Sequence, residues 1–491
     1  MPSIGDGLIH EATSLLALVD TIDQFVEEHQ NLYTYNHDTQ DLFAHVRTLA
    51  AETRERIGQL LKEAKQPQLD LTPLLRELAE QQRSWQLSHT YVKPAADAHT
   101  LNLPIQLVRI ATDHLHGLNL SRKANSGPGN PPTAATAKAD MDATDAGATT
   151  GPTTDRGRCD HEAPPTFQKD HVVVLLTPEF MYFHNRPSGD LRQNRAFLEI
   201  PYSQNQTFFS NILIYHELAH YVWAQLLEVE HPRLKAIIKA LEHTFPKNSQ
   251  IKPDRLAFAK SVLESWTQEL FCDVFALRHL GPAWSFALID FLSLISKADP
   301  KGELTFSEDH PAPAFRLREQ HKRLCSSGWW ESIADVASPH TGLMLSLSAE
   351  PEDEYLFANN KGPAAKDAMV KFMRLFKPLI PLVDSLVDDI VPNSKDSANF
   401  LQWRRRIEDC FLNGVVPSKL IAPGTSSSPT PVSMINAAYL VYISRLPELM
   451  DRLGQDDRDP DLRRRLIDRL QSWTMKAIDD YYLLTETESK V

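Results

Sequence analysis

Residues 212–223 read ILIYHELAHYVW, an apolar stretch that carries three titratable side chains on one helical turn. His216 and His220 are four residues apart, so on a helix they project from the same face, one turn apart. Glu217 is the next residue round the helix after His216. The apolar residues on either side predict a long, largely buried helix over residues 208–229.

A metal ion would explain why such a helix carries polar groups. Two imidazoles at this spacing can bind one Zn²⁺ ion, each at about 2.0–2.1 Å. Glu217 then lies close to the metal without having to bind it, and it can take a proton from the attacking water, as in the HExxH motif. Two alternatives remain. The histidines could pack in a core, and a chain with 19 histidines can contain the motif by chance.

A second apolar helix is predicted over residues 254–281, and it ends at Gly281 in a C-cap pattern. Glu269 and Asp273 share one face of this helix. Glu269 can supply the third protein ligand of a catalytic zinc site, and Asp273 can accept the far ring N–H of a zinc-bound histidine. Unpaired carboxylates are costly in such a helix, which favours a cation between them and the histidines. Cys272 is a possible soft ligand, although it lies off the face of the two acids.

A third motif begins at His310, which is followed by Pro311 and, six residues on, by Arg316. Pro311 and Pro313 predict a rigid turn before a new helix. A histidine held in this turn can donate a hydrogen bond to the oxyanion of a tetrahedral intermediate, which makes His310 a catalytic candidate. Arg316 can hold a carboxylate of the protein or of a substrate. The alternative is that this proline-rich segment only starts a helix.

In this order, HELAH, then ELFCD, then HP with an arginine six residues after the histidine, the motifs resemble those of gluzincin metallopeptidases. The chain looks most similar to the branch that contains the HtpX-type and CAAX-prenyl endopeptidases. The similarity covers about residues 171–320 and implies a zincin-like catalytic core with a small β-sheet and a bound Zn²⁺ ion. By this resemblance the zinc ligands are His216, His220 and Glu269, the general base is Glu217, Asp273 lies behind a zinc-bound histidine, and His310 and Arg316 form the late motif.

Two departures limit what the resemblance implies. Members of that branch are integral membrane proteins, whereas the longest apolar stretch here, residues 283–296, contains Asp290 and is shorter than the roughly 20 residues of a membrane span. Ala312 replaces the second proline of the family's HPP motif. Prenylated substrates are therefore not implied. In this fold class the substrate lies along an edge strand, for which the sequence offers residues 195–203.

The chain divides into four regions, and the expected fold class is α+β, predominantly α-helical. Residues 1–120 and 336–491 show helical periodicity and form two helical flanks. Residues 121–165 are rich in Gly, Pro, Ala, Thr and Asp, which predicts a disordered linker or inserted loop that could cover the site. Residues 166–335 hold the zincin-like region, which opens with a β-branched run predicted to be a buried strand at 171–178.

Charge and cysteine content exclude several classes of protein. A net charge of −13 argues against a general nucleic-acid or anionic-membrane binder, whose affinity comes from clustered Lys and Arg. Only four cysteines occur and no two form a CxxC pair, which is typical of a reduced, intracellular protein. The first residues carry acids and lack the basic segment of a secretory signal. We therefore expect a soluble cytoplasmic protein.

The sequence thus predicts a zinc-dependent endopeptidase that hydrolyses peptide bonds in a protein or peptide substrate. The first alternative is a catalytically silent zincin-like protein that binds a protein partner through its helical flanks and acts as an interaction or regulatory module. The second is an all-helical scaffold in which the HExxH motif arose by chance. Bound zinc would exclude the second alternative, and the activity of a Glu217→Gln variant would separate the first from an enzyme.

Overall fold

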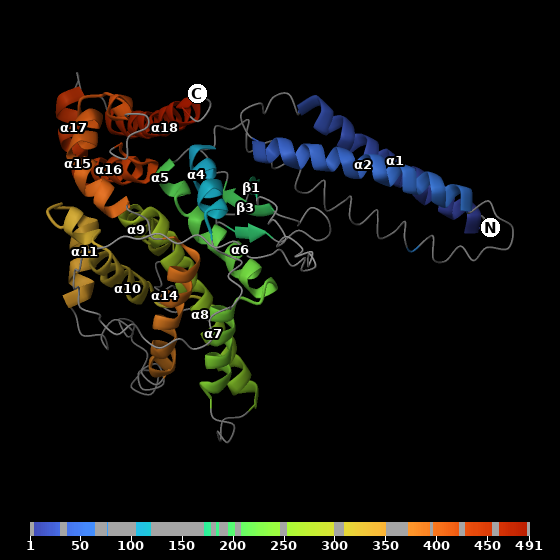
Figure 1. Ribbon diagram of the computed structural model, residues 1–491, viewed down its shortest axis with the longest axis horizontal. Helices are drawn as coiled ribbons and strands as arrows, with labels where there is room; N and C mark the ends of the chain where they lie inside the picture. Colours follow the sequence, from blue (N-terminus) through green and yellow to red (C-terminus); the bar gives the residue numbers. More distant parts are fainter. Residues whose placement is uncertain are drawn as a thin grey trace, which may run out of the picture.

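The described part of the chain is mostly helical, as the sequence predicts, and contains one small β-sheet (Figure 1). The segment 121–165, predicted to be disordered, lies outside the residues that the structure describes. The computed structural model describes residues 4–29, 37–63, 76, 105–118, 171–177, 183–185, 195–201, 208–245, 253–298, 309–349, 372–392, 396–421, 428–453 and 461–488.

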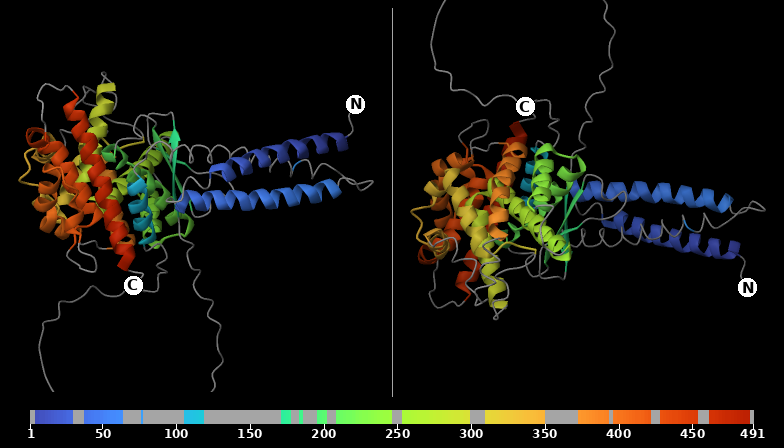
Figure 2. Two further views of the ribbon diagram at one scale, coloured as in Figure 1. Left: turned by 90° about the horizontal axis from the view of Figure 1, so that it is seen from above. Right: turned by 90° about the horizontal axis from the view of Figure 1, so that it is seen from below.

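The first two helices form a hairpin that projects from the rest of the molecule (Figure 2). Helix α1 spans Ile4–His29 and helix α2 spans His37–Glu63. Apolar residues recur at three-and-four spacing on their facing sides, as with Val19 and Ile22 of α1 and Val46 of α2. These side chains are fully buried, so the hairpin has an apolar seam of its own, separate from the main core.

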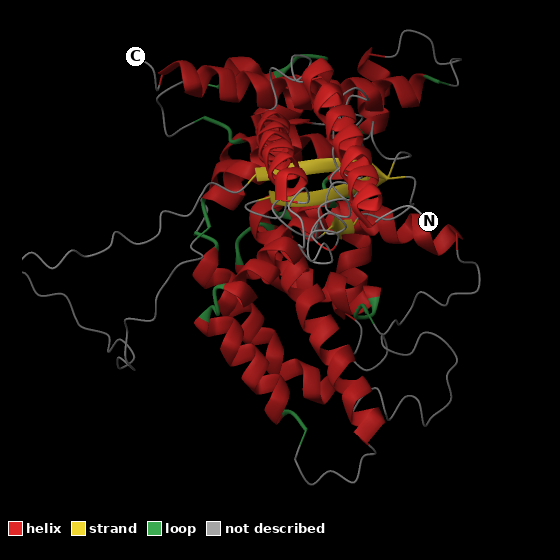
Figure 3. Ribbon diagram, turned by 90° about the vertical axis from the view of Figure 1, so that its right-hand side faces the viewer, coloured by secondary structure: helices red, strands yellow, loops and turns green. Residues whose placement is uncertain are grey.

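The sheet has three strands, β1 (His171–Thr177), β2 (Phe183–Asn185) and β3 (Arg195–Pro201), in the order β1-β3-β2. Strand β3 runs parallel to β1 and antiparallel to β2. Successive side chains of β3 face opposite sides of the sheet: Phe197 packs with the hairpin and Leu198 with the main core. The sheet therefore lies between the hairpin and the helices of the core (Figures 1 and 3). The predicted buried strand at 171–178 is confirmed.

The prediction that residues 195–203 form an edge strand is wrong. Strand β3 is hydrogen-bonded to a neighbour on both sides and lies in the middle of the sheet. Edge position depends on pairing with other segments, which the residues of β3 do not specify, and Phe197 and Leu198 are fully buried, one on each face of the sheet. The edges of the sheet that the described residues form are β1 and β2.

The long helix predicted over residues 208–229 is interrupted. It consists of α5 (Phe208–Asn211), a turn at residues 212–213, and α6 (Ile214–Glu228). At the break the backbone hydrogen bonds connect residues three apart, as from the His216 N–H to the Leu213 carbonyl at 3.0 Å. The break places His216 in the first turn of α6 rather than in the middle of a longer helix.

Helix α8 (Pro253–Leu280) meets α9 (Pro282–Ala298) at Gly281, which has a φ of +59°. The predicted C-cap is therefore confirmed. Asn436 clamps this corner from a distant helix. Its side-chain oxygen accepts from the backbone N–H of Ala283 at 2.8 Å, and its amide nitrogen donates to the carbonyl of Leu280 at 2.9 Å. One buried amide thus satisfies one backbone group at the end of α8 and one at the start of α9.

The other helices share one apolar core with α5 to α9. Helices α16, α17 and α18 lie together at one end of the molecule (Figure 1). The division into domains at residue 335 stays a prediction. No helix in the described part of the chain is long and apolar enough to cross a membrane. The remaining elements are α4 (Ile105–His116), α7 (Pro232–His243), α10 (Pro313–Ser326), η5 (Trp330–Ser332), α11 (Pro339–Ala349), η6 (Lys377–Leu379), α14 (Ile380–Ile390), α15 (Asp396–Leu412), η7 (Pro417–Leu420), α16 (Pro431–Ser444), α17 (Leu446–Leu453) and α18 (Leu462–Glu488).

We predict that Gly281→Ala destabilises the protein by about 2 kcal/mol or more, measured by urea unfolding. Alanine is strained at a φ of +59°, and its Cβ would lie 2.7 Å from Cε2 of Trp329. Gly342→Ala is the matched control, because no atom lies within 4 Å of a Cβ built there. Helix α11 should tolerate that alanine or gain from it. Equal unfolding midpoints for the two variants would contradict the prediction.

Candidate metal centre

The three predicted zinc ligands converge. Helix α6 packs against α8, and this contact brings His216 and His220 onto Glu269. The distance from His216 Nε2 to Glu269 Oε2 is 3.0 Å, and that from His220 Nε2 to Glu269 Oε1 is 3.3 Å. A single carboxylate therefore joins both imidazoles, one oxygen to each. His216 and Glu269 are buried and His220 is nearly so.

Asp273 lies behind His216, where the sequence predicted it. Its Oδ1 is 3.3 Å from Nδ1 of His216, an ion-pair distance without the angles of a hydrogen bond. Arg316 holds the same carboxylate with two hydrogen bonds, from Nε to Oδ2 and from Nη2 to Oδ1, each 2.7 Å long. Asp273 and Arg316 are both buried, so this bidentate pair connects α10 to α8 in a solvent-excluded place.

His310 also reaches the cluster. Its Nε2 lies 3.4 Å from Glu269 Oε2, and its side chain is 48% exposed. The hydroxyl of Ser265 on α8 donates to the carbonyl of Asp309 at 3.0 Å, which ties the His310 turn to that helix. His310 therefore lines the side of the cluster that is open to solvent, while His216 and Asp273 lie at its buried end.

The charges of the cluster are strongly coupled. Burial disfavours the charged form of His216, but the carboxylates of Glu269 and Asp273 outweigh it and raise the pKa of His216 to about 10. Burial likewise acts against ionised Glu269, yet the neighbouring histidines hold the pKa of its carboxyl well below the usual range. The pKa of Asp273 is lowered, against the effect of burial, by Arg316. Without a metal, the cluster thus holds an imidazolium between two carboxylates.

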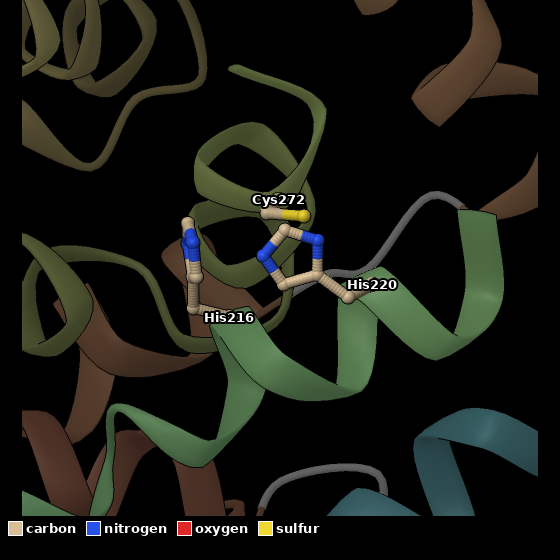
Figure 4. A group of neighbouring side chains, drawn as sticks. All are labelled: His216, His220 and Cys272. Carbon is tan, nitrogen blue, oxygen red and sulfur yellow. The ribbon is translucent and has the colours of Figure 1, made fainter. Parts of the chain in front are cut away.

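Cys272 belongs to the cluster as well. Ligand atoms of His216, His220 and Cys272 all lie within 4.8 Å of one another. Figure 4 shows the two rings projecting from α6 and the thiol approaching from the neighbouring helix. Cys272 therefore lies at the candidate site, although it is one position off the helix face that carries Glu269 and Asp273. Burial and the charges of Glu269 and Glu217 raise the pKa of the Cys272 thiol well above its usual value.

The donor atoms suit zinc. Imidazole nitrogen, carboxylate oxygen and thiol sulfur are its common ligands, whereas Mg²⁺ and Ca²⁺ prefer sites made of oxygen alone. Two sets are available, the histidines with Glu269 or the histidines with Cys272. The first set has direct contacts of 3.0 and 3.3 Å, and the second has only the wider 4.8 Å limit, so we place Glu269 first. Glu217 is partly buried on the first turn of α6, beside His216.

Two residues of the cluster were missed from the sequence. The side-chain amide of Gln268 lies 3.0 Å from Nδ1 of His220. If the amide is turned so that its oxygen faces Nδ1–H, Nε2 of His220 stays free for a metal. The indole of Trp284 stacks on the ring of His216, with centroids 5.7 Å apart and planes 10° from parallel. The position of Gln268 directly before Glu269 could have indicated that it lies near the site. No local sequence pattern indicates that Trp284 lies near His216.

A cavity of about 310 Å³ lies elsewhere, and no predicted site residue lines it. It is lined by residues of α8, α10, α14 and α15, together with Ser327 and Trp329 after α10. Arg278 and Arg323 face it, but Asp388 and Asp384 respectively pair with them. Because these charges are already paired, the cavity adds no catalytic group to the candidate site.

We predict that Arg316→Met lowers the free energy of unfolding by about 3–5 kcal/mol, because it leaves the Asp273 carboxylate buried with only His216 beside it. Arg452→Met is the control. Arg452 pairs with Glu448 where both side chains are more than a third exposed, so its loss should cost less than about 1 kcal/mol. Chemical unfolding of both variants measures the difference. Similar losses in the two would show that the Asp273 pair is no more important than a surface one.

The metal-free protein should lose stability as the pH rises. The pKa of His216 is about 10 in the fold and about 6.5 in an unfolded chain, so its stabilising charge is fully present below pH 6.5. This contribution falls between pH 6.5 and 10, by up to about 1.4 kcal/mol per pH unit. Unfolding of the chelator-treated protein at pH 7, 8 and 9 measures the slope. His216→Gln should remove the slope, and a flat profile in the wild type would refute the charge assignment.

Comparison with known proteins identifies no relative of this chain. No family model, no curated protein and no solved structure matches the chain. The assignment of the site therefore depends on the residues and distances given above.

Proposed function

We propose that this chain is a zinc-dependent endopeptidase that cleaves proteins or peptides in the cytoplasm, with a zincin-like core similar to that of the gluzincins. The observation that carries the proposal is the meeting of His216, His220 and Glu269, with Glu217 beside the first histidine. This arrangement has the parts of a hydrolytic site: two imidazoles and a carboxylate for a metal, and a second carboxylate for proton transfer.

Each side chain has a defined task in this proposal. Bound Zn²⁺ would polarise the scissile carbonyl and make the attacking water more acidic. Glu217 takes the proton of that water and passes it to the leaving amine. His310, whose pKa is lowered chiefly by burial, is neutral and donates one N–H to the developing oxyanion. Arg316 and Asp273 keep the ring of His216 in place through contacts at its Nδ1 side.

The order of the strands also indicates which strand an extended substrate could pair with. Strand β3 is paired on both sides, so it cannot add a peptide. Strand β2 is an edge, runs antiparallel to β3, and contacts α6, the helix that carries the two histidines. We propose that an extended substrate adds to the outer edge of β2, where main-chain hydrogen bonds would hold it near Glu217.

A second function is favoured by the N-terminal hairpin. Helices α1 and α2 project from the body of the molecule (Figure 2), as an arm for binding another protein would. In this alternative the zincin-like region is catalytically silent and the chain acts as an interaction or regulatory module.

Glu217→Gln separates the two functions. In the enzyme, replacing the general base should lower hydrolysis of a peptide library by about 100-fold or more, while one zinc ion per chain is retained. Peptide products are measured by mass spectrometry and zinc by elemental analysis. Glu228→Gln, on the exposed last turn of the same helix, is the matched control and should leave the rate unchanged.

Two outcomes would contradict the proposal, the first the enzyme assignment and the second the role of Glu217. A zinc-loaded wild type that cleaves no peptide in the library would favour the silent module. A wild-type activity that persists in Glu217→Gln would show that another group is the base.

A further inference from the structure

Cys272 brings a thiol into the cluster, and the proposed mechanism gives this thiol no task. It follows Glu269 by three residues on α8, so the two are neighbours on the helix surface, with Cys272 beside the face that carries Glu269 and Asp273. Its side chain is fully buried, and its sulfur lies within 4.8 Å of ligand nitrogens of both His216 and His220 (Figure 4). The thiol therefore lies where the apolar core around α8 meets two imidazoles that can bind a metal.

The other cysteines in the described residues differ in each of these respects. Cys325 is exposed and Cys410 is partly buried, and neither belongs to a group of three metal-binding side chains. The position of Cys272 therefore does not follow from a general preference of this protein for buried thiols. It follows from the way α8 presents Glu269 and Cys272 together to α6.

The number of donors is the second observation. His216 and His220 take part in two sets of donors, one with Glu269 through contacts of 3.0 and 3.3 Å and one with Cys272 within 4.8 Å. Four protein ligands complete the tetrahedral coordination of zinc and are typical of structural sites, whereas a catalytic site has three and keeps one position for water. If all four bind together, the position that hydrolysis requires is filled.

We infer that Cys272 is a fourth protein ligand of the metal and that its thiolate closes the site in the resting protein. The inference rests on the proposed zinc site and adds its regulation. Binding breaks the S–H bond, the sulfur keeps the electron pair and forms the bond to the metal, and the proton passes to solvent. Rotation of the Cys272 side chain, with protonation of its sulfur by solvent, reverses these steps and opens the position. The thiolate also sets metal preference, because it favours Zn²⁺, Co²⁺ and Cd²⁺ over Mg²⁺ and Mn²⁺.

Cobalt substitution tests the inference without relying on activity. The full-length protein is stripped with a chelator and loaded with one equivalent of Co²⁺. The wild type should show a near-ultraviolet thiolate-to-cobalt charge-transfer band together with intense visible bands of a tetrahedral ion. Cys272→Ser should lose the near-ultraviolet band and keep bound cobalt. Cys159→Ser, Cys325→Ser and Cys410→Ser are matched controls and should retain the band.

Zinc-loaded Cys272→Ala provides a second readout. Removing the thiol should raise the rate of peptide hydrolysis several-fold over the wild type at equal zinc content, because the water position is then free. Should Cys272→Ser or Cys272→Ala fail to fold, X-ray absorption of the zinc-loaded wild type decides instead. One sulfur neighbour is expected, and its absence overturns the inference.

The outcomes separate this inference from the proposed function. Cobalt bound without a charge-transfer band, or a band that survives in Cys272→Ser, overturns the role of Cys272 and leaves the peptidase standing. A band that depends on Cys272, with no hydrolysis by any variant, supports the ligand and refutes the peptidase. A wild type that binds neither zinc nor cobalt overturns both.

Discussion

The ion pair between Arg316 and Asp273 is the contact on which the geometry of the site depends. It joins α10 to α8 by two hydrogen bonds of 2.7 Å, and the same carboxylate approaches the ring of His216 at 3.3 Å. Burying two charges is costly, and the cost is offset only when the geometry is good and the remaining polar atoms are satisfied. The pair therefore restricts how α8 and α10 can pack, and it holds Asp273 at Nδ1 of His216 while Nε2 faces Glu269.

The ligand positions were predictable because helical spacing is a local property. Four-residue spacing alone placed His216 with His220, and Glu269 with Asp273, on common helix faces. The long-range position of Arg316 came from the order of the motifs, and the structure puts it on Asp273. The ligand roles of these residues stay predictions.

What the sequence could not predict depends on contacts between elements. The order of the strands follows from hydrogen bonds between segments far apart in the chain, so the central place of β3 was not visible in its own residues. The rotation of α8 about its own axis decides whether Cys272 faces α6. Cys272 is only one position away from Asp273, so the sequence could not predict this rotation. Trp284 reaches His216 only because the chain reverses at Gly281, which no local pattern connects to the histidines.

The clamp formed by Asn436 has a consequence for how the site could be isolated. The histidines, the acids and the late motif all lie within residues 216–316, which suggests a compact catalytic fragment. Yet the corner that directs Trp284 onto His216 is closed by an amide from α16, more than a hundred residues further along the chain. A fragment that ends before α16 would lack this amide and would expose the apolar surface shared with the C-terminal helices. During synthesis, the corner beside the proposed metal ligands is therefore completed only after α16 has left the ribosome.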